Sequence, residues 1–191
     1  MGNGIVESLK KEFDIDDEWV SFEIHPETPP EGISMDALFP KSSREQMHAR
    51  LRASGEPYGL QFTDNDWLSN SRLALEASEF ARDTGRFHEF HSRVFRAYFS
   101  EARDIGDRGV LSEIAKDSGL DTAALNAALD EGRYRSRIEE GQHEGQRYGV
   151  TGTPTYIINN KYKVVGAQPL EVMRRALNEI AERERSAGAE S

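Results

Sequence analysis

Two short β-type runs near the C-terminal end set the strongest limit on how this chain can fold. Thr155–Ile158 and Lys163–Val165 flank Asn159 and Asn160, residue types suited to a tight turn, so this stretch predicts a hairpin. One further strand is predicted at Glu18–Ile24, where two sets of side chains alternate. The predicted strands therefore lie toward the two ends of the chain.

The rest of the pattern is helical. Gly4–Phe13 places Ile5, Leu9 and Phe13 at helical spacing, and a last helix is predicted after Pro169. Between them, helices are predicted at Ser43–Ala53, from Ser71 to Gly85, at Arg86–Phe99, from Asp107 to Gly119, from Asp121, and at Arg133–Tyr148.

This order predicts an α/β chain with two domains. We expect residues 1–41 and 149–191 to form most of a thioredoxin-like domain that lacks its first strand. Residues 42–148 are expected to form an all-helical domain inserted into it.

Composition limits the partners and the compartment. The formal net charge of -10 argues against nucleic acid as a partner, because proteins that bind it concentrate Lys and Arg to displace counterions. No run approaches the roughly 18 apolar residues that span a bilayer, so no membrane partner is expected. The N-terminal residues lack the basic and apolar regions of a secretory signal, and we expect a cytoplasmic protein.

The sequence contains no cysteine. This excludes disulfides, thiolate metal sites and thiol catalysis by these 191 residues acting alone.

The segment "GVTGTPTYIINNKYKVVGAQP" raises the question of why Pro154 immediately precedes a predicted strand. A proline at the start of a strand leaves neighbouring backbone groups unpaired, and these can hold an extended peptide. From the residues alone, cis and trans forms of the Thr153–Pro154 bond both stay open.

Together with "FEIHPETPPEG" and "FRAYFSEARDIGD", that segment resembles the cytoplasmic, FrnE-like branch of the DsbA-like thiol–disulfide oxidoreductases, over essentially the whole chain. The resemblance implies that Pro154 is a cis-proline facing a redox dithiol and that the backbone of Thr153 binds an extended peptide or thiol substrate. It also places His25 at a strand end, where this side chain either fixes the loop or lines the cleft. No cofactor and no metal are implied.

The family pattern begins with a strand and a Cys-x-x-Cys motif, and the resemblance aligns residues 1–4 just after them. Our preferred explanation is that Met1 is an internal methionine of a longer reading frame. The alternatives are a truncated protein that takes a strand from a partner, including a homodimer, and a degenerate relative that only binds.

Two other functions stay open. One is a glutathione-dependent isomerase or transferase of the kappa type, which shares the inserted helical layout, although Ser8 lies too far along its helix for the serine of that class. The other is a non-catalytic peptide-binding module.

Weaker candidates have simpler interpretations. His88 and His91 have a usable metal-ligand spacing, but no acidic residue joins them, and helix-interface imidazoles are expected instead. The aromatic residues of the same helix could line a substrate groove, whereas core packing is the favoured interpretation. These aromatic residues are Phe87, Phe90, Phe95, Tyr98 and Phe99.

Overall fold

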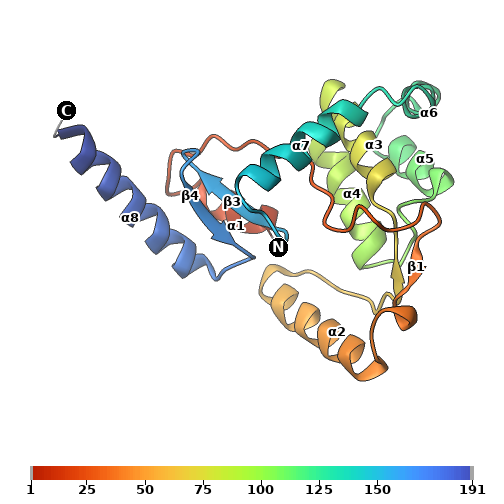
Figure 1. Ribbon diagram of the computed structural model, residues 1–191, viewed down its shortest axis with the longest axis horizontal. Coiled ribbons are helices and arrows are strands. Elements are labelled where there is room, and N and C mark those ends of the chain that lie inside the picture. The colour runs from red at the N-terminus through yellow and green to blue at the C-terminus, as the bar shows by residue number, and fades with distance from the viewer. Residues whose placement is uncertain (1, 190–191) are drawn as a thin grey trace. The chain divides into compact units, whose positions relative to one another are not determined.

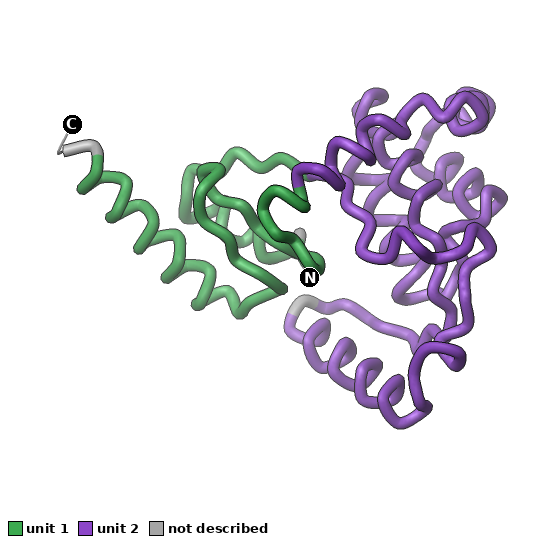
Figure 2. The backbone as a smooth tube through the Cα atoms, in the orientation of Figure 1, with its two compact units in different colours: residues 1–19, 145–191 green, residues 20–144 purple. Residues whose placement is uncertain are grey.

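The computed structural model describes residues 2–189 of the chain. It divides into two compact units, which Figure 2 draws in green and purple. We call residues 1–19 with 145–191 the terminal unit, and residues 20–144 the helical unit. The elements of the described residues, most of them labelled in Figure 1, are α1 (Gly2–Leu9), β1 (Ile33–Ser34), η1 (Met35–Ala37), α2 (Lys41–Gly55), η2 (Glu56–Tyr58), β2 (Trp67–Leu68), α3 (Arg72–Asp83), α4 (Phe87–Phe99), α5 (Arg108–Asp117), α6 (Thr122–Asp130), α7 (Arg135–Arg147), β3 (Thr155–Ile158), β4 (Tyr162–Val165) and α8 (Leu170–Ala189). The elements η1 and η2 are 3-10 helices.

The terminal unit contains the predicted hairpin. Strands β3 and β4 are antiparallel, with Thr155 opposite Val165 and Ile158 opposite Tyr162. Asn159 and Asn160 have φ of 52° and 53°, the left-handed conformation that asparagine tolerates better than most residues and that tight hairpin turns require. The turn chemistry of the sequence therefore fixes the hairpin.

Helices α1 and α8 contact each other in the same unit. The buried apolar residues that the structure describes in this unit come from these two helices: Ile5, Leu9, Met173 and Ile180. Beyond the end of α1, the Glu12 carboxylate accepts hydrogen bonds from Nε and Nη2 of Arg174, at 2.6 and 2.7 Å. This guanidinium lowers the pKa of Glu12 below its ordinary value.

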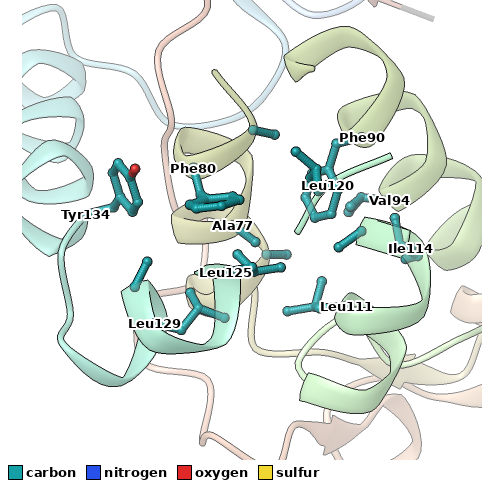
Figure 3. Close-up of a cluster of buried hydrophobic side chains, with 14 of the residues drawn as sticks. Ala77, Phe80, Phe90, Val94, Leu111, Ile114, Leu120, Leu125, Leu129 and Tyr134 are labelled. Atoms are coloured by element: carbon teal, nitrogen blue, oxygen red, sulfur yellow. The ribbon is translucent and has the colours of Figure 1, made fainter. Parts of the chain in front are cut away.

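The helical unit has its own hydrophobic core, built mainly from α3, α4, α5 and α6 (Figure 3). Phe90, Leu111, Ile114 and Leu125 have no exposed surface. Burial of a side chain of this size stabilises a fold by about 1.5–3 kcal/mol. The core packing predicted for the aromatic residues of α4 is confirmed for Phe90, but Phe95 is exposed over 49% of its surface.

Asp107 and Asp121, at the predicted starts of two helices, act as N-caps. Asp107 Oδ1 accepts a hydrogen bond from the N–H of Val110 at 2.9 Å, and Asp121 Oδ1 accepts from the N–H groups of Ala123 and Ala124. These contacts begin α5 and α6 where the sequence indicates.

The strand predicted at Glu18–Ile24 is not formed within the described part of the chain. Exposed and half-buried side chains alternate from Asp14 to Trp19, which is the period of an extended backbone. A strand also needs a neighbouring strand, and here the backbone N–H of Glu23 instead donates to the side chain of Gln142 at 3.0 Å.

The division of the chain differs from the expected boundaries. We expected residues 1–41 to join 149–191, but residues 20–41 belong to the helical unit. Side-chain contacts of Ser21 and Glu23 with helices of the helical unit account for this difference, as does the short antiparallel pairing of β1 with β2. No helix among residues 2–189 is long and apolar enough to cross a membrane.

Candidate functional site

The loop before β3 is held on both sides of Pro154. The Thr153–Pro154 peptide bond is cis. The carbonyl of Pro154 accepts a hydrogen bond from the N–H of Gly166 at 2.8 Å, and Thr155 Oγ1 donates to the carbonyl of Gly152 at 2.7 Å. These bonds fix the backbone on either side of Thr153.

Thr153 itself is open to solvent. Its side chain is exposed, and neither its N–H nor its C=O has a hydrogen-bond partner within residues 2–189. The ladder of the hairpin begins only at Thr155. An unpaired, exposed backbone next to a strand end is the geometry by which proteins add an extended peptide to a sheet.

The N-terminal end of α1 lies against this loop within the terminal unit. An ideal Cβ placed on Gly2 would lie 3.3 Å from both Pro154 Cβ and Tyr156 Oη. The Tyr156 hydroxyl donates to the carbonyl of Gly2 at 3.4 Å. Pro154 and the start of α1 therefore lie next to each other, although 152 positions separate Gly2 from Pro154 in the sequence.

This end of α1 is electropositive. The first N–H groups of a helix have no partner inside it, and the helix dipole places roughly half a positive charge there. The first turn of α1 contains no acidic side chain to neutralise this charge. The site therefore favours an anion or an anionic atom, such as a thiolate sulfur, over a neutral group.

His25 lies in the helical unit, and Thr153 and Pro154 lie in the terminal unit. The imidazole is half exposed, and its Nδ1 is 3.2 Å from Glu27 Oε1. The carbonyl of His25 accepts from the N–H of Thr28 at 3.1 Å, so this residue takes part in a turn. These contacts agree with the loop-fixing role that the sequence allows.

Among residues 2–189, no group of three or more His, Asp or Glu side chains is arranged to hold a metal ion. His91 stacks on Phe87 with ring centroids 5.0 Å apart and contacts Phe95 at 4.5 Å. Burial, with smaller effects of His88 and Arg82, lowers the pKa of His91 to about 4. The imidazole is therefore neutral at neutral pH.

Sequence reasoning identified Thr153 and Pro154 but missed Gly2 and Tyr156. The available signal for Tyr156 was its place two residues after Pro154, because alternate residues of an extended segment point to the same side. No local pattern pointed to Gly2, and only the family resemblance, which aligns residues 1–4 just after a dithiol facing Pro154, indicated this closeness.

Comparison with known proteins agrees with this geometry. Residues 2–178 match the DSBA-like thioredoxin domain family. The uncharacterised protein YwbO of Bacillus subtilis (strain 168) is 28% identical over 182 residues, which are 94% of this chain and 89% of that protein. The thiol:disulfide interchange protein DsbA of Pseudomonas aeruginosa is 25% identical over 103 residues, 52% of this chain and 48% of the relative.

A crystal structure of a probable DsbA oxidoreductase from Streptomyces coelicolor superposes with a TM-score of 0.85. The superposed region is 93% of this chain and 82% of the Streptomyces coelicolor chain, and the two sequences are 22% identical. The thioredoxin-like fold expected from the sequence is thereby confirmed.

Proposed function

Because the chain belongs to the DSBA-like thioredoxin domain family, we propose that it is the scaffold of a protein thiol–disulfide oxidoreductase of the cytoplasmic, FrnE-like branch. In this proposal Thr153 and Pro154 hold an extended polypeptide beside the start of α1. His25 keeps the role of a residue that fixes its own loop.

The unpaired backbone of Thr153 carries the proposal. One N–H and one C=O of an exposed residue, without partners within residues 2–189 and next to a strand end, can pair with a polypeptide of any sequence. Main-chain recognition of this kind suits an enzyme that acts on many different disulfides. The electropositive end of α1 beside Pro154 supports the same function, because it stabilises the thiolate form of a thiol placed there.

The exchange step needs a thiol that these residues do not contain. A thiolate attacks one sulfur of a disulfide, forms a mixed disulfide, and releases the other sulfur as a thiolate. Since the sequence has no cysteine, the 191 residues are expected to bind a substrate without exchanging its disulfide.

Binding is tested by NMR on the 191-residue chain with a thiol-blocked, unfolded polypeptide. The amide of Thr153 should shift and become protected from hydrogen exchange. The amide of Lys161, already bonded to the carbonyl of Ile158 at 3.1 Å, is the internal control and should not change. An unchanged Thr153 amide at saturating polypeptide would refute the binding site.

Activity is tested separately by insulin reduction. No turnover above the dithiol background is expected, and measurable turnover would contradict the proposed inertness. Calorimetric binding of glutathione in place of the polypeptide would instead support the kappa-type function.

A further inference from the structure

The segment Val20–Ile24 is fastened to α7 by one side-chain amide. Gln142 Oε1 accepts from the N–H of Glu23 at 3.0 Å, and Gln142 Nε2 donates to the carbonyl of Glu23 at 3.1 Å. The amide thus satisfies both backbone groups of one residue, as a neighbouring strand would. Each such bond contributes about 0.5–1.5 kcal/mol.

Two carboxylates fasten the same segment to α3. Ser21 Oγ donates to Glu79 Oε1 at 2.6 Å, and Glu23 Oε2 is 2.6 Å from Arg72 Nη2. Glu23 and Glu79 are almost completely buried, with 3% and 5% of their surface exposed. We call these contacts of Ser21 and Glu23 with Glu79, Arg72 and Gln142 the clasp.

A third buried carboxylate, Glu76, lies on α3 between Arg72 and Glu79, at the spacing that places all three on one face of the helix. Only 2% of its surface is exposed, and its Oε2 has no hydrogen-bond partner within the described residues. Its Oε1 is 4.0 Å from Nε of Arg135, a largely exposed side chain. A buried carboxylate that lacks partners is costly in its charged form.

The charged groups around Glu76 come from four elements. Arg72 lies on α3, Arg135 on α7 and Arg108 on α5, and Glu23 comes from the segment Val20–Ile24. Burial is the largest influence and raises the pKa of Glu76, the cations oppose it, and Glu23 adds to it. Ionised Glu76 therefore repels Glu23 and competes with it for Arg72.

We infer that Glu76 is a proton-operated latch: the clasp holds Val20–Ile24 tightly when Glu76 is protonated and loosens when Glu76 ionises. The direction of this pH dependence follows from the linkage between proton binding by Glu76 and closure of the clasp. A carboxyl group that binds its proton more tightly in the closed state stabilises that state at low pH. This stabilisation is lost as the pH rises from the ordinary pKa of the carboxyl group through its raised pKa in the closed state.

The test is hydrogen exchange of the Glu23 amide from about pH 5 to about pH 8, expressed as a protection factor so that base catalysis of exchange cancels. In the unmodified protein this protection should fall with rising pH, by about tenfold for every unit by which the closed state raises the pKa of Glu76. In Glu76→Gln the profile should be flat. The amide of Leu111, bonded to the carbonyl of Asp107 at 3.1 Å in the core, reports global unfolding. Protection of the Glu23 amide below that of Leu111 shows that Glu23 exchanges by local opening of the clasp.

Equal slopes at the Glu23 amide in the unmodified protein and in Glu76→Gln overturn the inference, because the two proteins share every other ionisable group. If Glu76→Gln does not fold, Arg135→Met gives a second test at an exposed position. Loss of this cation should move the fall in protection to higher pH, and an unmoved profile overturns the inference. Glu89→Gln, at an exposed site on α4, is the matched control and should leave the profile unchanged.

Discussion

Gly141 on α7 is the position where a single methyl group should open the clasp. An ideal Cβ on this residue would overlap the carbonyl oxygen of Ser21 and lie 3.2 Å from both the carbonyl carbon of Ser21 and Cγ1 of Val20. The overlapping atom is backbone, so relief requires movement of the segment Val20–Ile24 away from α7. The change Gly141→Ala therefore tests whether this contact orders the segment.

The magnitude combines three effects. Overpacking costs about 1–3 kcal/mol. Separation of Gln142 from Glu23 loses two hydrogen bonds of about 1 kcal/mol each. Alanine in a helix interior recovers about 1 kcal/mol relative to glycine. Gly141→Ala should thus destabilise the protein by about 3 kcal/mol, a large share of the typical total of about 5–15 kcal/mol.

The assay is urea unfolding followed by far-UV circular dichroism, with Glu139→Ala as the control on the same helix. Glu139 is an exposed residue of α7, so shortening its side chain removes little buried surface. The stability of this control should be unchanged. A Gly141→Ala protein as stable as the parent would refute the reasoning, because only the helix-propensity gain would then be operating.

Three further changes test other parts of the structure. The thiolate of Gly2→Cys should be stabilised by about 0.3–2 kcal/mol relative to the thiolate of Lys11→Cys. The pH dependence of alkylation on the N-acetylated chain measures this difference, and equal profiles would argue against an electropositive site. Phe90→Ala should cost about 3–5 kcal/mol in urea unfolding, because the side chain is fully buried, and a cost near zero would contradict the core. Arg174→Met should raise the pKa of Glu12 toward its ordinary value in an NMR titration. It should also remove the contribution of this ion pair to folding stability, which is present at neutral pH and is lost as the pH falls through the lowered pKa of Glu12.

Local signals in the sequence were sufficient for much of the fold. The asparagine pair of the hairpin turn and the caps Asp107 and Asp121 act through residues a few positions away, so their effect can be read from the sequence. The loop at Thr153 and Pro154 was also found in advance, because proline before a β-type run is a local feature.

Contacts between distant residues could not be predicted in this way. The prediction of a strand at Glu18–Ile24 was wrong because alternating side chains indicate an extended backbone but do not supply a neighbouring strand. The pairing of Gln142 with Glu23 spans 119 positions, and no pattern near either residue indicates it. No local pattern indicates the contact between Gly2 and Pro154 either, and only the family resemblance pointed to it.

The clasp has a consequence for the order in which the chain folds. The terminal unit is assembled from two pieces separated by about 125 residues, and closing a flexible loop of that length costs about 4 kcal/mol in chain entropy. When the helical unit folds first, the clasp brings the first residues of this loop beside its last ones, and that entropy has already been lost. We therefore expect residues 20–144 to nucleate folding through their own core, with the terminal unit joining late and losing its order whenever the helical unit unfolds.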